Sequence, residues 1–154
     1  MREYRKATRE DFDHLLKLAK LMHEESSYSH LKFSEDRFLH TVEKNLEDLN
    51  SCIYLALEDD NPIGVYAGFV SKYFFSDELV ANDIAWYVIP EERGKGNNSP
   101  SLKLLDMFEL WAKDRGVSEV RVGITTDINI EKFDGLMNHL GYDRVGYTYR
   151  LKGD

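Results

Sequence analysis

The sequence feature that most constrains the fold is a short glycine-rich segment, Arg-Gly-Lys-Gly-Asn-Asn at residues 93–98, between an apolar stretch and a helical pattern. Gly94 and Gly96 allow backbone conformations with positive φ and a close approach of the chain to a ligand. Arg93 and Lys95 add positive charge. Because N–H groups at the start of a helix bind phosphate oxygens well, such a turn suits a phosphate group. A plain strand-to-helix connection with a basic tip is the alternative that these residues leave open.

Hydrophobic periodicity predicts strands and helices on both sides of this turn. Apolar stretches bounded by turn residues predict one or two closing strands at the C-terminus and, before them, strands at residues 2–7, 52–58, 63–74, 82–89 and 117–124. Helical spacing of apolar residues predicts helices at about 12–22, 34–49, 99–113 and 130–140. The order β-α-α-β-β-β-α-β-α-β is that of an α/β (α+β) fold, a mixed sheet with helices on both faces.

Length and composition favour one compact unit. The 154 residues contain no internal repeat, low-complexity stretch or flexible linker, so a single domain over residues 1–154 is expected. No stretch approaches about 20 consecutive apolar residues, and the N-terminal residues lack the apolar core of a signal peptide. Cys52, the single cysteine, excludes an internal disulfide and a cysteine-built zinc site. These features favour a cytoplasmic protein without a membrane segment.

The formal net charge of −8 bears on the kind of partner. It argues against non-specific binding to nucleic acid, which requires a basic surface. It suits a cationic acceptor such as an amine, and it serves solubility equally well. The five histidines are too scattered in sequence to predict a metal site.

The residues before and within the glycine-rich segment carry a family resemblance. The stretch 88–96, Val-Ile-Pro-Glu-Glu-Arg-Gly-Lys-Gly, resembles the central motif of the GCN5-related N-acetyltransferase superfamily, Gln/Arg-x-x-Gly-x-Gly/Ala, which follows a strand and an x-Pro corner. Leu140-Gly141-Tyr142 resembles the Leu-Gly-Phe that usually ends a helix in this family, and the element order resembles it over the whole chain. The resemblance implies a mostly antiparallel sheet and transfer of an acetyl group from acetyl-CoA to a primary amine by direct attack.

The same resemblance implies where coenzyme A would bind. In the family, a bulge late in the motif strand opens a gap between the fourth and fifth strands, and the pantetheine arm lies in it. Backbone groups of Trp86, Tyr87 and Val88 would then contact that arm and the thioester. Asn129 lies near the position of a CoA-contacting asparagine. The pyrophosphate would be held by amides of the turn, with Ser99 nearby: Arg93, Gly94, Lys95, Gly96, Asn97 and Asn98.

Two positions depart from the family pattern. The last Gly/Ala of the motif is Asn98, which tolerates positive φ better than most residues but adds a side chain at the pyrophosphate. Met137 stands where many members carry the tyrosine that protonates the leaving thiolate. The alternative that these departures support is a non-catalytic acyl-CoA-binding or interaction module on the same fold.

Direct attack requires a neutral amine, so a proton acceptor is sought near the motif strand. Asp83 is the first candidate, because several family members carry a glutamate at about this position; an exposed acid at a strand end is the alternative. Strand alternation predicts Asp83, Ala85 and Tyr87 on one face and Trp86 and Val88 on the other.

A second group of candidates lies between the first two helices, a segment that lines the acceptor side in this family. Glu24 and Glu25 are alternative bases, or a solvated helix end. The resemblance also allows a homodimer, since edge strands in the family often pair subunits. Candidate acceptor-binding residues of the same segment are His23, Tyr28 and His30.

Overall fold

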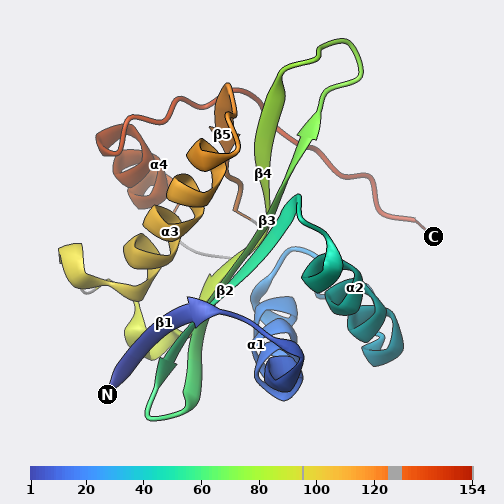
Figure 1. Ribbon diagram of the computed structural model, residues 1–154, viewed down its shortest axis with the longest axis vertical. Helices are drawn as coiled ribbons and strands as arrows, with labels where there is room; N and C mark the ends of the chain where they lie inside the picture. The colour runs from blue at the N-terminus through green and yellow to red at the C-terminus, as the bar shows by residue number, and fades with distance from the viewer. Residues whose placement is uncertain (95, 125–129, 154) are drawn as a thin grey trace.

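The computed structural model describes residues 1–94, 96–124 and 130–153. Within them the chain forms a five-stranded sheet in the order β1-β2-β3-β4-β5, with β5 parallel to β4 and the other neighbours antiparallel (Figure 1). The predicted mixed, mostly antiparallel sheet is therefore confirmed. The strands are β1 Arg2–Lys6, β2 Ser51–Glu58, β3 Asn61–Lys72, β4 Leu79–Val88 and β5 Glu119–Arg121.

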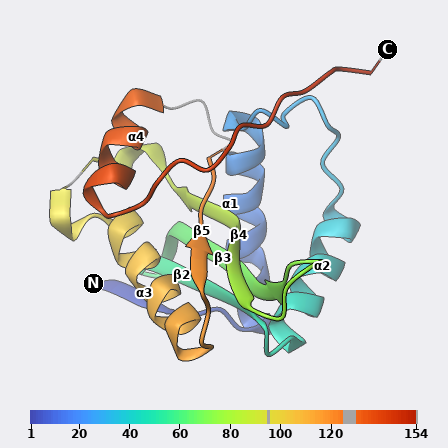
Figure 2. The same cartoon turned by 90° about the horizontal axis from the view of Figure 1, so that it is seen from above.

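Helices cover both faces of this sheet, as predicted. α1 and α2 lie on one face and α3 and α4 on the other, which Figure 2 shows from above. Each face has its own apolar cluster: Leu18 and Tyr87 belong to the α1–α2 side, and Tyr66 and Phe108 to the α3 side. The helices are α1 Phe12–Glu25, α2 Glu35–Glu47, α3 Pro100–Asp114 and α4 Ile130–His139.

Side-chain caps explain where the helices begin. The Thr8 amide donates to the Asp11 carboxylate over 2.8 Å in a capping box just before α1. Ser34 caps α2 by accepting from the Arg37 amide at 3.2 Å. Ser99 caps α3 in the same way. The cap of α3 fixes the end of the glycine-rich turn at the start of a long buried helix.

A β-bulge interrupts β4 at Ile84. Ala67 pairs with Ala85 and Gly68 with Asp83, so Ile84 is one residue too many for the ladder. The bulge reverses the alternation of the strand beyond it. Asp83 therefore shares the α3 face with Trp86, and the predicted grouping of Asp83 with Tyr87 is wrong, because the bulge lies directly after Asp83 and not later in the strand, near Val88, as expected.

Gly68 allows α3 to approach the sheet beside this bulge. A methyl group at Gly68 would lie 2.2 Å from the ring of Phe108 and 2.8 Å from the carbonyl oxygen of Asn82. Both distances are far below van der Waals contact. Phe108 in turn stacks on Tyr66 with ring centroids 4.4 Å apart. Glycine is therefore required for the packing that holds β3, β4 and α3 together.

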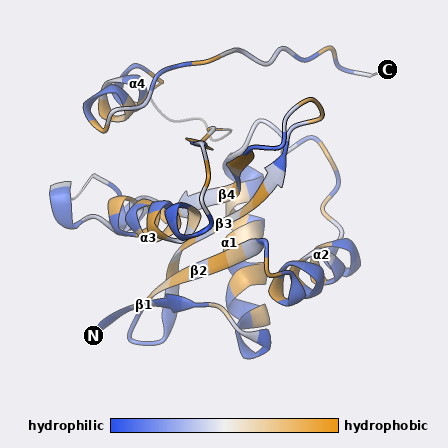
Figure 3. Cartoon of the chain, turned by 45° about the horizontal axis from the view of Figure 1, so that its top comes forward, coloured by the Kyte–Doolittle hydropathy of each residue, from blue (hydrophilic) through white to orange (hydrophobic). Residues whose placement is uncertain are grey.

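The C-terminal segment corrects the predicted element order. No strand forms in the described residues 142–153, and β5 has only three of the eight residues predicted for it. The segment leaves the end of α4, crosses to the other side of the sheet and stays clear of it (Figure 3). Its alternating apolar side chains remain exposed, at 76% for Val145, 70% for Tyr147 and 88% for Tyr149. The alternation has the period of a strand, but a strand also requires a paired edge, and none is supplied here.

Candidate acetyltransferase site

The glycine-rich turn has the backbone conformation that its sequence predicts. Gly94 has φ of 73° and Gly96 has φ of 69°, both in the left-handed region. A methyl group at either position would meet nothing within 4 Å, so the requirement for glycine is conformational and the surrounding space is open. The turn leads directly into the first turn of α3. An anion placed there would face the positive end of the helix.

Arg93 does not point into the turn. Its Nε donates to the Val88 carbonyl oxygen at 2.8 Å, and its guanidinium forms an ion pair with Glu25 at 2.9 Å. The guanidinium also lies over the Tyr87 ring, 5.3 Å from its centre, and the Tyr87 hydroxyl donates to Glu25. These contacts tie the start of the turn to the last residue of α1. Glu25 is thus a structural anchor in this conformation, with no free carboxylate facing an acceptor.

β4 and β5 separate halfway along β4. Their pairing ends at Asn82 and Arg121. Beyond this point β4 continues to Val88 paired with β3 on one side only, within the described residues. The other side offers the N–H and C=O groups of an unpaired strand, which can bind an extended ligand as a further strand would. This open edge runs from the bulge to the glycine-rich turn.

Asp83 marks the point of separation. Its Oδ2 accepts from the Gly123 amide at 3.1 Å. Burial raises the pKa of the Asp83 carboxyl above its ordinary value, and donation from the Gly123 amide opposes this effect. No ion pair to Asp83 is found in the part of the chain that the structure describes. The carboxylate is therefore a better proton acceptor than an exposed aspartate.

Comparison with solved structures finds this fold in acetyltransferases. An aminoglycoside N-acetyltransferase, AAC(6')-Iy in complex with a bisubstrate analogue, superposes with a TM-score of 0.75 at 16% identity, over 100% of this chain and 99% of that chain. A predicted acetyltransferase with acetyl-CoA from Clostridium acetobutylicum gives 0.74 at 16% identity, over 99% and 96%. The chain has the GCN5-related N-acetyltransferase fold. No family model and no curated protein sequence matches it.

Function does not follow from the acetyltransferase fold by itself. A transcriptional regulator from Bacillus halodurans C-125 superposes equally well, with a TM-score of 0.74 at 14% identity over 99% of this chain and 100% of that chain. The local chemistry of the site must therefore carry the functional argument.

A cavity of about 600 Å³ lies beside the separation of β4 from β5. α1, the loop after it, α2, β2, β3 and β4 form its walls, and Gly123 and Ile124 line it near Asp83. Three of the predicted catalytic and acceptor-binding residues, His23, Tyr28 and Asp83, line it together. A cavity of this size is typical of a small-molecule site.

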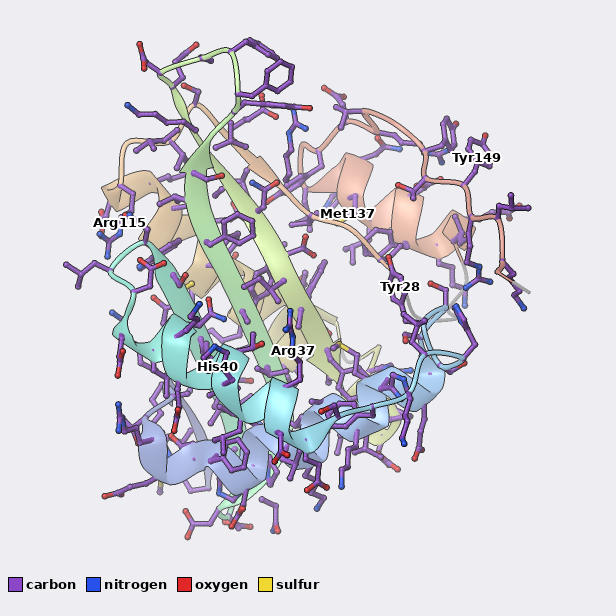
Figure 4. All side chains as sticks on the ribbon, turned by 90° about the vertical axis from the view of Figure 1, so that its right-hand side faces the viewer. Tyr28, Arg37, His40, Arg115, Met137 and Tyr149 are labelled. Atoms are coloured by element: carbon purple, nitrogen blue, oxygen red, sulfur yellow. The ribbon has the colours of Figure 1, made fainter. Side chains whose placement is uncertain are left out.

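The other residues of the predicted acceptor segment lie elsewhere. Glu24 is exposed and Glu25 is half-buried, and neither lines the cavity. His30 lies 3.4 Å from a guanidinium nitrogen of Arg150, which also donates to the Ser27 carbonyl oxygen. The C-terminal segment thus contacts the loop after α1, where Figure 4 places Tyr28.

Apart from Arg93, which pairs with Glu25, the predicted cofactor residues divide into four groups. Trp86, Tyr87 and Val88 lie on the open edge of β4, and the Trp86 indole nitrogen donates to the Ser101 carbonyl oxygen of α3 at 3.2 Å. The Ser99 hydroxyl is used for capping and is buried. Lys95 and Asn129 lie outside the described residues. The remaining four form the turn: Gly94, Gly96, Asn97 and Asn98.

Sequence reasoning missed Tyr66, which lies under the site. It is fully buried, and its hydroxyl has no hydrogen-bond partner among the described residues. Burial raises the pKa of Tyr66, and the charge of nearby Asp83 raises it further. Nothing in the sequence distinguishes this tyrosine from the other aromatic residues of β3, since its special position depends on the bulge opposite.

Other kinds of site are not found in the described ranges 1–94, 96–124 and 130–153. Among these residues no group of three or more His, Cys, Asp or Glu side chains is placed to hold a metal ion. No helix within the same ranges has the length and apolar character needed to cross a membrane.

Proposed function

We propose that the chain is a single-domain N-acetyltransferase that transfers the acetyl group of acetyl-CoA to a primary amine. The observation that carries the proposal is the open edge of β4, which joins a glycine turn at the start of α3 to a carboxylate with a raised pKa. The acetyltransferase fold supports it, and two of the structural neighbours are described as acetyltransferases with CoA-type ligands.

The residues at the open edge fit coenzyme A. Backbone groups of Trp86, Tyr87 and Val88 would orient the pantetheine arm, because that side of β4 lacks a neighbouring strand. The pyrophosphate would lie against the turn, where Gly94 and Gly96 leave open space. Acetyl-CoA supplies the activated acyl group, and the chain supplies its alignment and the proton acceptor.

Asp83 would accept the proton of the attacking amine, directly or through one water. Lysine-type amines have a pKa near 10.4 and are largely protonated at neutral pH, so a nearby base is required. The amine nitrogen forms a bond to the acetyl carbon, the carbon–sulfur bond breaks, and its electron pair leaves with sulfur. The proton taken by Asp83 returns through water to the thiolate.

A non-catalytic acyl-CoA-binding module is the second candidate. Met137, which stands at the family's tyrosine position, is buried in α4 at 7% exposure, and its thioether cannot donate a proton. This candidate predicts coenzyme A binding without turnover.

One assay tests both candidates. The chain is incubated with acetyl-CoA and a set of primary amines, and the CoA thiol that is released is followed with a thiol reagent. Cys52 is the only thiol of the protein and is buried, so it contributes little background. Amine-dependent thiol release supports the transferase. Coenzyme A binding by calorimetry, with no release for any amine, supports the binding module.

A further inference from the structure

The cavity at Asp83 is lined mainly by apolar side chains. Its inner wall comes from α1, α2, β2 and β3, and these residues are largely shielded from solvent. They are Leu15, Ala19, Val42, Ile53 and Val65. Two aromatic rings, Phe33 and Phe38, form the wall nearer the surface, with ring centres 5.7 Å apart. Such a wall gains free energy by covering an apolar body, and it offers few partners to a ligand rich in hydroxyl or ammonium groups.

The charges on this cavity are not those of a site for polycations. Among the described residues that line it, Asp83 is the one carboxylate, while Lys32 and Arg37 carry positive charge. Neither Lys32 nor Arg37 forms an ion pair within the described residues, although both lie at the rim. Figure 4 shows Arg37 extending from the start of α2 toward β3 and β4.

Two acidic residues that adjoin lining residues in the sequence, Glu35 and Glu25, are each paired with a basic residue outside the lining. Glu35, beside the start of α2, is paired with Lys20. Glu25, at the end of α1, is paired with Arg93 and lies outside the lining. The formal charge of −8 is therefore carried largely by surfaces other than this cavity.

We propose that the acceptor is a monoamine with an apolar body about the size of an aromatic ring and a carboxylate at its far end. This inference rests on the proposed acetyl transfer. The amine faces Asp83 and the thioester, the body covers the apolar wall, and the carboxylate meets Arg37 and Lys32. Polyamines and aminoglycosides are poor acceptors, because further ammonium groups would lie against the two cations or on the apolar wall.

Three acceptors test this assignment: 4-(2-aminoethyl)benzoate, 2-phenylethylamine and spermidine. A hydrogen-bonded ion pair to the carboxylate is expected to raise kcat/KM for the benzoate about tenfold over phenylethylamine. Spermidine is expected to be the poorest of the three. Equal or higher kcat/KM for spermidine overturns the proposal.

The rim cations are tested with the double variant Lys32→Gln/Arg37→Gln, whose side chains are exposed and whose folding should be unaffected. The ratio of kcat/KM between the benzoate and phenylethylamine is expected to fall from about tenfold to about one. Arg9→Gln is the matched control, since Arg9 is an exposed arginine outside the cavity, and it should leave the ratio unchanged. A ratio that persists in the double variant contradicts the role of the rim.

Direct binding separates failure of this inference from failure of acetyl transfer. Each amine is titrated calorimetrically into the protein saturated with CoA, which requires no turnover. Binding of the benzoate in preference to spermidine, without acetylation of either, supports the proposed ligand of the cavity and contradicts the proposed acetyl transfer. Acetylation of spermidine in preference to the benzoate supports the proposed acetyl transfer and contradicts the proposed acceptor class.

Discussion

Asp83 is both shielded from solvent and accessible to a ligand, two properties that one carboxylate seldom combines. It is buried enough for its pKa to be raised, yet it lines a cavity and lies at the open edge of β4. The bulge at Ile84 creates this position by ending the regular ladder beside it. The sequence suggested Asp83 as a base from its place in the motif strand, but it could not show which face of the sheet the carboxylate would share.

Asp83→Asn keeps the shape of the side chain and removes the base. General-base assistance is typically worth about 10²–10⁴ in rate, so kcat should fall at least about tenfold at neutral pH. The loss should shrink at high pH, where the amine is already neutral. Because the folded pKa is raised, ionising Asp83 opposes folding as the pH rises through it, so the variant should be at least as stable as the wild type at pH 7. Rate profiles and denaturant unfolding check both statements; full kcat at every pH excludes Asp83 as the base.

Tyr66→Phe tests the unpaired hydroxyl beneath Asp83. A buried polar group without a partner costs about 1–3 kcal/mol, so removing it should raise the free energy of unfolding by about 1 kcal/mol. Urea unfolding measures the change. A less stable variant would show that the hydroxyl has a partner in solution, such as a buried water.

Among the helices and strands, the helix starts could be predicted from the sequence, whereas the bulge in β4 could not. The start of α2 was predicted at residue 34, because the residue that caps it, Ser34, lies beside the helix in the sequence. The bulge at Ile84 depends on the pairing of β4 with β3, and the need for Gly68 depends on Phe108 of α3. Neither the bulge nor the requirement for glycine at position 68 can be recognised from neighbouring residues in the sequence. The apolar cavity beside the bulge could therefore not be predicted either.

The glycine turn can be tested with a pair of matched variants. Gly96→Glu places a side chain and a negative charge in the proposed phosphate site and should abolish coenzyme A binding. Gly116→Glu is the control, because Gly116 also has positive φ, at 75°, and open space around it, but lies at the far end of α3. Each substitution should cost about 1–2 kcal/mol of stability. Calorimetry on both folded variants decides the assignment, and unchanged CoA affinity in Gly96→Glu contradicts it.

Glu25 is expected to act through the turn and not through the acceptor. Glu25→Gln removes the charge that pairs with Arg93, so the start of the turn should be held less firmly and the Kd for CoA should rise. Glu24→Gln, the neighbouring exposed residue, should have no effect. Initial-rate measurements separate the two sides of the reaction: a rise in the acceptor KM alone would place Glu25 at the acceptor instead.

In the described part of the molecule, the C-terminal segment after α4 pairs with no strand of the sheet. The C-terminal segment has the apolar alternation of a strand, with Val145, Tyr147 and Tyr149 exposed, while β5 is short and has no neighbour on its outer side among the described residues. The family resemblance allows a homodimer, and we propose that a second copy supplies the missing edge. The sequence predicted a strand here because alternation is local, whereas the partner that a strand requires is not.

Removing residues 142–154 tests this arrangement. The full chain should sediment as a dimer, and the shortened chain as a monomer that retains the helices and strands before the cut. The replacement of Tyr147 and Tyr149 by Ser provides a second route to the same result without shortening the chain. A full chain that sediments as a monomer at all concentrations contradicts the proposed dimer.

The extra residue in β4 has a consequence for how this chain can change in length. Loss of Ile84 would let Asp83 and Ala85 follow one another in a regular ladder opposite Gly68 and Ala67, and each later side chain would keep its partner and its face. The contacts of Tyr87 with Glu25 and of Trp86 with Ser101 would remain, but the strand would lose the irregularity at which it parts from β5. Insertions and deletions should therefore accumulate in the hairpin at residues 73–78, while the number of residues between Asp83 and the glycine turn stays fixed.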